Sequence, residues 1–206
     1  MNSGYLSFIL MSITLILLAS GWKTLYVGGV SHQRLLLFFA SWIVSARLTV
    51  TVENVHVRLV YALIAALSFL ILYRTQGIVH KVHLLSIGLL LGSLHFLLQQ
   101  LLEMDPILII RNPAWESAAI IAVVAVAVQR NCWEQFAAIS LGYVIGDLYQ
   151  AGIREIDGYH RLGYAAFQDQ WWLSIFLART LTIVLQAAYT GCRSLLRSLF
   201  ERNGGR

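Results

Sequence analysis

The residues best able to do chemistry lie in an apolar stretch that reads LHFLLQQLLEMDP between Leu94 and Pro106. Within it His95, Gln99 and Glu103 recur every four residues, a spacing that places them on one side of a helix. An imidazole, an amide and a carboxylate on one face can hold a ligand, move a proton or bond to a neighbouring helix. The stretch therefore predicts either a binding site or a polar packing surface.

Two more ionisable residues, Asp147 and Arg179, lie in other apolar stretches. Such groups are costly at membrane depth and usually face the interior of a helix bundle or a wet cavity. We therefore predict one cluster made of His95, Gln99, Glu103, Asp147 and Arg179. Its members either bind a ligand or form a buried polar cluster that fixes the helices, and we expect Arg179 to form an ion pair with Asp147 or Glu103.

The composition indicates that lipid surrounds most of the chain. Of 206 residues, 58% are hydrophobic and only 12% are charged, whereas soluble domains carry about 25% charged residues. The mean hydropathy is +0.70. The net charge of +5 is scattered between apolar runs and gathered in a basic tail. That pattern fits lipid headgroups as partners and argues against nucleic acid.

Charged residues divide the chain into seven apolar segments, which predicts an all-α polytopic bundle. The segments are 4–22, 34–50, 56–73, 83–102, 113–128, 133–150 and 171–190, and the short fifth one leaves six spans as the alternative. Nine Lys and Arg on one side against five on the other favour an outer N-terminus and an inner C-terminus. The outer five are Arg47, Arg58, Arg111, Arg154 and Arg161.

We expect residues 1–192 to form a single transmembrane domain and residues 193–206 a basic cytoplasmic tail. Helix-start signals support two of the segments: Pro113 suits a first helical position, and Asn131 with Glu134 forms a capping pattern. The long outer loop 151–170 could cover the polar cluster as a lid or lie on the membrane surface.

Glycines four residues apart mark faces on which helices can approach closely. The pairs are Gly88 with Gly92, on the face that also carries His95, and Gly142 with Gly146. These faces could bind a membrane protein partner or a second copy of the chain.

Known intramembrane enzyme motifs are incomplete. The string Val144-Ile-Gly-Asp147 lacks the first glycine of the GxGD pattern of aspartyl proteases, and only His95 lies deep in an apolar segment. We therefore expect no enzyme, no metal and no cofactor. The leading hypothesis is a non-enzymatic protein with an outward-facing polar cavity that binds a small ligand or serves a transport complex. The alternative is a scaffold or assembly factor with purely structural polar residues, and a third is an intramembrane hydrolase.

The string LLEMDPILII over residues 101–110, followed by the apolar segment from Pro113, resembles the YphA-like family. Its members are small multi-spanning bacterial membrane proteins without an assigned activity. The resemblance implies a bacterial inner-membrane location and an uncharacterised role. It supplies no functional residues.

Overall fold

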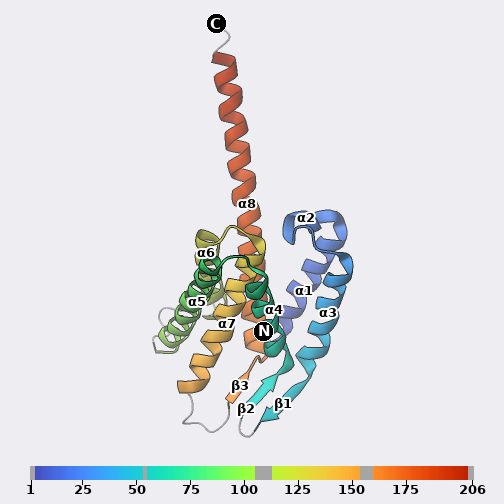
Figure 1. Ribbon diagram of the computed structural model, residues 1–206, viewed down its shortest axis with the longest axis vertical. Helices are drawn as coiled ribbons and strands as arrows, with labels where there is room; N and C mark the ends of the chain where they lie inside the picture. Colours follow the sequence, from blue (N-terminus) through green and yellow to red (C-terminus); the bar gives the residue numbers. More distant parts are fainter. Residues whose placement is uncertain (1–2, 53–54, 105–112, 154–159, 204–206) are drawn as a thin grey trace.

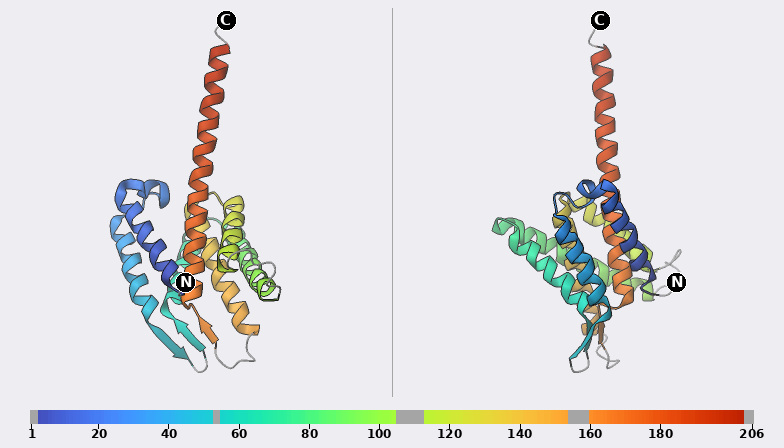
Figure 2. Two further views of the ribbon diagram at one scale, coloured as in Figure 1. Left: turned by 180° about the vertical axis from the view of Figure 1, so that it is seen from behind. Right: turned by 90° about the vertical axis from the view of Figure 1, so that its right-hand side faces the viewer.

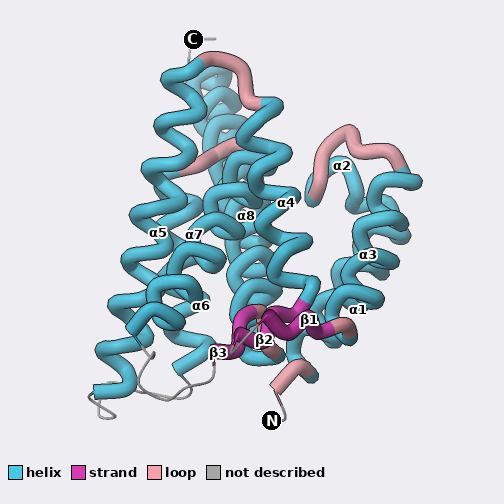
Figure 3. Tube along the Cα trace, turned by 60° about the horizontal axis from the view of Figure 1, so that its bottom comes forward, coloured by secondary structure: helices cyan, strands magenta, loops and turns pink. Residues whose placement is uncertain are grey.

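The computed structural model describes residues 3–52, 55–104, 113–153 and 160–203. These residues form long helices that run in alternate directions, with a small sheet at one end of the bundle (Figures 1 and 3). The elements are α1 (Tyr5–Leu17), η1 (Leu18–Trp22), α2 (Lys23–Tyr26), α3 (His32–Arg47), β1 (Thr49–Val52), β2 (Val55–Arg58), α4 (Leu59–Arg74), α5 (Ile78–Met104), α6 (Pro113–Val128), α7 (Cys132–Ile153), β3 (His160–Leu162) and α8 (Ala165–Asn203).

The predicted all-α fold is confirmed, since every predicted apolar segment lies largely within a helix. Four helices in the described residues are long and apolar enough to cross a membrane: Tyr5–Tyr26, Ile78–Met104, Cys132–Ile153 and Ala165–Ser194. Helices α4 and α6 are apolar but shorter. The start signal at α7 acts as predicted, because the Asn131 side chain accepts a bond from the Trp133 amide at 3.1 Å and donates to Glu134.

The three-stranded sheet was not predicted, and it shortens two of the expected spans. Residues 49–50 belong to β1 and residues 56–58 to β2, so α3 ends at Arg47 and α4 begins at Leu59. Strands β1 and β2 are antiparallel, and β3 pairs with β2 in parallel. The alternating β-branched residues of Thr49–Val52 favour a strand over a helix. The predicted loop 151–170 likewise contains β3 and the start of α8.

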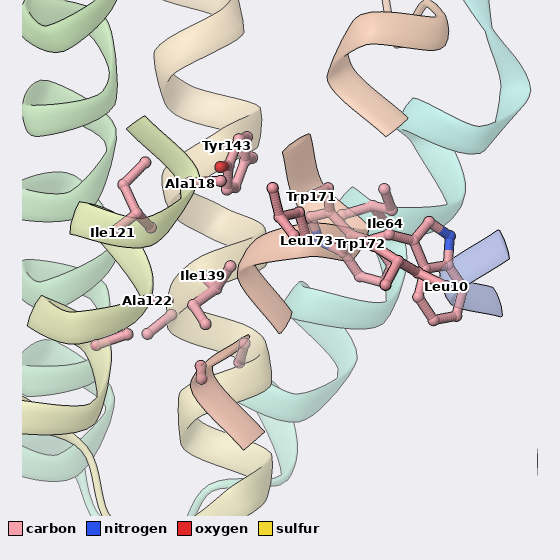
Figure 4. Packing of buried hydrophobic residues seen from close by; sticks show 14 of the residues in the cluster. Leu10, Ile64, Ala118, Ile121, Ala122, Ile139, Tyr143, Trp171, Trp172 and Leu173 are labelled. Carbon is pink, nitrogen blue, oxygen red and sulfur yellow. The ribbon is translucent and has the colours of Figure 1, made fainter. Parts of the chain in front are cut away.

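Helix α8 provides the centre of the bundle through two adjacent tryptophans. The Trp171 side chain is fully buried, stacks on Trp42 of α3 at 4.9 Å between ring centroids, and meets Trp172 edge-on. Figure 4 shows both tryptophans between Tyr143 of α7 and Leu10 of α1. The helix that contains the predicted segment 171–190 starts earlier than that segment, because α8 begins at Ala165 and Trp171 lies about a turn and a half inside it.

The two predicted glycine pairs pack against each other inside the chain. A Cβ atom on Gly142 would lie 2.7 Å from the Leu91 Cβ, and one on Gly92 would lie 2.9 Å from the Ile145 Cβ. The backbones of α5 and α7 thus approach as closely as these residues allow. Because each glycine face covers the other, neither is available to a second copy of the chain, contrary to the expectation above.

Helix α8 continues far beyond the rest of the bundle (Figures 1 and 2). Its 39 residues correspond to roughly 58 Å at 1.5 Å per residue, about twice the thickness of a bilayer core. The predicted tail from residue 193 continues the same helix as far as Asn203. Arg193 and Arg197 are exposed on this projecting part.

Candidate functional site

Gln99 of α5 is the centre of a hydrogen-bonded cluster that joins three helices. Its amide nitrogen bonds to His95 Nε2 at 3.0 Å and donates to the Gln170 amide oxygen of α8 at 3.1 Å. Its amide oxygen accepts a bond from Gln150 of α7. We call His95, Gln99, Gln150 and Gln170 the glutamine cluster. Two of the predicted residues therefore meet, but their partners are amides and not charges.

His95 is held in one orientation by its surroundings. Only 1% of the side chain is exposed, and its ring lies 4.4 Å from the ring of Tyr143. Gly146 makes room for the imidazole, since a Cβ there would lie 2.7 Å from His95 Cδ2. Because an amide nitrogen can only donate, Nε2 accepts from Gln99 and the ring proton lies on Nδ1. No described residue accepts a bond from Nδ1.

A second set of bonds, farther from the sheet than the glutamine cluster, fastens α7 to α8 and α6. The Tyr143 hydroxyl bonds to the Ser174 hydroxyl at 2.7 Å, and Ser174 donates to the Ala118 carbonyl of α6 at 3.0 Å. The Trp171 indole donates to the Ser140 hydroxyl at 3.0 Å. These bonds satisfy polar groups that have no access to water, which is what a buried packing surface requires.

Asp147 and Glu103 both lie at the sheet end of the bundle. Asp147 bonds to a backbone amide, whereas the Glu103 side chain is exposed. The Asp147 carboxylate accepts a bond from the Gly163 amide at 3.2 Å and so holds the segment between β3 and α8. Gly163 itself has a φ of 72°, a left-handed conformation that favours glycine. Glu103 is exposed in the last turn of α5.

Arg179 does not join the other four predicted residues. Its Nε donates to the Tyr26 carbonyl at 2.9 Å and its terminal nitrogen to the Leu25 carbonyl at 2.8 Å, so it closes the C-terminal end of α2. It lies near Cys132, at the opposite end of α7 from Asp147. Fifteen residues of helix separate these two ends, or about 22 Å. Neither expected ion pair of Arg179 forms among the described residues, so that prediction is wrong.

The error has a simple geometric origin. Counted from Trp171, the first residue of the predicted segment 171–190, Arg179 lies only about 12 Å along its helix. The actual start at Ala165 adds six residues, or about 9 Å, and carries Arg179 to the far side of the bundle. There Gln135 of α7 bonds to Thr182 at 3.2 Å, one more polar link between α7 and α8.

The sequence also gave no indication of how Asp169 is used. Its two carboxylate oxygens accept bonds from the amides of Gly4 and Ser7, both at 2.6 Å, and so cap the start of α1. Helix α1 has no acidic residue in its own first turn. The capping residue stands more than 160 positions away, and no local pattern can reveal such a partner.

Within the described residues, no group of three or more His, Cys, Asp or Glu side chains could hold a metal ion. The two cysteines are free: Cys132 bonds to the Tyr26 carbonyl at 3.3 Å, and Cys192 is exposed on α8. The polar side chains described above form hydrogen bonds that link the helices to each other.

Long apolar helices tied together by internal polar bonds define a polytopic α-helical integral membrane protein. The family comparison agrees: the chain belongs to the YphA-like integral membrane protein family, whose sequence model matches residues 24–203. The predicted resemblance is thus confirmed. Neither a search of curated proteins nor a search of solved structures found a match.

Proposed function

We propose that the protein is a non-enzymatic membrane scaffold or assembly factor, in which the intramembrane polar residues hold the bundle and α8 reaches out of it. The glutamine cluster carries this proposal. Gln99 uses both its amide nitrogen and its amide oxygen on neighbouring helices, so its bonding capacity serves α5, α7 and α8. A ligand site would instead leave several polar atoms directed into open space.

The placement in the membrane forms part of the proposal. Open sheet edges need water or headgroups, because unpaired backbone groups are costly in hydrocarbon. The end that carries β1, β2 and β3 therefore lies at a membrane face. We assign it to the outer face of a bacterial inner membrane, and the projecting part of α8 to the cytoplasm. Seven helices cross between these faces. The excess of Lys and Arg on the inner side supports this orientation.

Cysteine labelling tests the orientation with residues that the chain already offers. Cys192 is exposed on projecting α8, and Thr49 is exposed in β1. In intact cells from which the outer membrane has been stripped, a membrane-impermeant maleimide should label Thr49→Cys in a cysteine-free background. The same reagent should label Cys192 only after the cells are opened. Labelling in the reverse order would refute the orientation.

A double-mutant cycle tests the structural role of the glutamine cluster. Gln99→Leu and Gln150→Leu should each lower stability, because each leaves a buried or partly buried amide without its partner, at a cost of up to about 1–3 kcal/mol. The double variant should be less destabilised than the sum of the two single variants, since both members of the pair are gone. Additive effects would mean that the two amides do not act on each other.

The scaffold role is tested by removing the projecting part of α8. A chain that ends at Thr190 retains every contact of the glutamine cluster and should melt at the temperature of the full chain. Extracted in a mild detergent, the full chain should migrate on native gels as an assembly heavier than its own 23.1 kDa plus detergent, and the shortened chain should not. A full chain that runs as a single copy would refute the scaffold role.

The unsatisfied Nδ1 of His95 favours ligand binding as a second candidate function. A small hydrogen-bond acceptor could occupy that position. A thermal-shift screen with small polar solutes distinguishes the two. A solute that stabilises the wild type but not His95→Phe would support binding at this ring. If every solute shifts the melting temperature of the two proteins equally, ligand binding at His95 is refuted and only the scaffold role stands.

A further inference from the structure

Two arginines from neighbouring strands share one aromatic ring at the sheet end. The Arg58 guanidinium lies 4.6 Å from the centroid of the Tyr164 ring, and the Arg161 guanidinium lies 5.6 Å from the same centroid. Arg58 ends β2, Arg161 is in β3, and the parallel register brings the two strands together. Cation–π contact with one ring holds two like charges close to each other despite their repulsion.

No carboxylate balances this pair within the described residues. Neither guanidinium lies within 4.0 Å of a described Asp or Glu oxygen. Arg58 is half-buried and Arg161 is exposed, so both can be reached from outside the bundle. Arginine forks match the oxygens of a phosphate group in geometry as well as in charge. The pair therefore has the composition of an anion site.

The backbone adds positive potential at the same place, because three helices begin there. Gly163, just before α8, lies against the first turn of α4: a Cβ on it would be 2.7 Å from the Tyr61 Cβ and 3.3 Å from the Tyr61 amide nitrogen. The start of α1 is also close, since a Cβ on Gly4 would lie 3.3 Å from the Ala165 Cβ. Each helix start contributes roughly half a positive charge.

Among the described residues, two carboxylates face this region, and both are already engaged. Asp169 accepts bonds from the first amides of α1, and Asp147 accepts one from Gly163. Set against the two guanidinium groups and three helix starts, these described carboxylates leave the described groups with an excess of roughly one and a half positive charges. An oxyanion of one or two negative charges would neutralise it.

We propose that Arg58, Arg161 and Tyr164 form a binding site for a phosphate group, supplied either by the headgroup of an anionic phospholipid or by a free phosphate compound. The two guanidinium groups bind the phosphate oxygens, and the Tyr164 ring keeps both side chains in place before the ligand arrives. This site is separate from the glutamine cluster and does not depend on the scaffold role.

The test measures thermal stability of the full chain in a neutral detergent, read from tryptophan fluorescence. The probes are short-chain phosphatidylglycerol in mixed micelles, phosphatidylcholine as the zwitterionic control, and inorganic phosphate. Phosphatidylglycerol should raise the melting temperature in a saturable way, and phosphatidylcholine should not. Stabilisation by phosphatidylglycerol alone assigns the site to lipid, and equal stabilisation by inorganic phosphate assigns it to a free phosphate compound.

Variants separate this site from general charge effects. Arg58→Gln/Arg161→Gln should weaken the apparent affinity for the stabilising probe at least about tenfold, the loss expected when charge-assisted bonds to phosphate are removed. The control Arg34→Gln/Arg74→Gln removes the same charge from two exposed arginines outside the sheet, and it should stay within about twofold of wild type.

Equal losses in the two double variants, or unchanged affinity in Arg58→Gln/Arg161→Gln, would overturn the proposal, as would the absence of stabilisation by either phosphate probe. If that double variant does not fold, the single variant Arg161→Gln replaces it. Arg161 is exposed in a three-residue strand, and its substitution should still weaken binding severalfold.

Discussion

Replacing Gly142 by alanine tests whether the close contact between α5 and α7 holds the bundle together. The new Cβ would lie 2.7 Å from the Leu91 Cβ and 3.3 Å from the Gly92 nitrogen. Carbon atoms in contact prefer about 3.5–4.0 Å, so the helices must move apart by about 1 Å. Because the atom it meets is a Cβ next to the backbone, no change of Leu91 rotamer can relieve the clash.

The cost is that of overpacking a well-filled interface, about 1–3 kcal/mol. A matched control is Gly152→Ala in the same helix, where a new Cβ meets nothing within 4 Å. Each variant gains helix propensity of at most about 1 kcal/mol, and Gly152, next to the end of α7, gains no more than Gly142. Their difference is therefore a lower bound on the cost of the contact. At about 2–4 °C per kcal/mol for a chain of this length, Gly142→Ala should melt roughly 2–12 °C below Gly152→Ala.

The assay is thermal unfolding of purified protein in detergent, with a titration of sodium dodecyl sulfate as a second measure of stability. A Gly142→Ala protein that is as stable as Gly152→Ala would refute the reasoning. Such a result would mean that the two glycine faces are loosely packed and that other contacts set the position of α5.

Three further substitutions test contacts made by single residues. Arg179→Gln should lower stability by about 1.5–3 kcal/mol, the worth of a charged hydrogen bond, whereas Arg193→Gln on projecting α8 should have little effect, both measured by thermal unfolding. Asp169→Asn keeps only one acceptor oxygen for the first amides of α1 and should cost about 1 kcal/mol, seen as faster proteolysis near the N-terminus. Gly163→Ala combines a φ of 72° with a clash against Tyr61, and loss of folded protein on size exclusion is the expected outcome.

The helices were predictable because apolar length and charge punctuation are local signals. Helix α6 runs from Pro113 to Val128, the bounds that the sequence predicts, and Asn131 caps α7 as its spacing with Glu134 indicates. The strands were not predicted, because apolar composition does not distinguish them from the neighbouring helices. The alternating Thr and Val residues of Thr49–Val52 are about as apolar as the adjoining helical segments. A reading of composition alone therefore assigns part of the strand to the neighbouring span.

The site was harder to predict, because spacing identifies a helix face but not the helix that it meets. His95 and Gln99 were correctly assigned to an inward face, yet the amides that bind Gln99 come from two other helices. Charge complementarity suggested that Arg179 would pair with Asp147. A six-residue error in the start of α8 was enough to separate them, because each residue adds about 1.5 Å along the helix axis.

The uneven lengths of the helices have a consequence for the surrounding bilayer. Helices α3, α4 and α6 have 16 residues each, or about 24 Å, against a hydrocarbon core of about 30 Å. In the proposed seven-span arrangement, lipids beside these helices must compress, while α5, with 27 residues, meets no such mismatch. The protein would thus carry a thinned, asymmetric rim of lipid that favours short acyl chains and draws in other proteins with short spans.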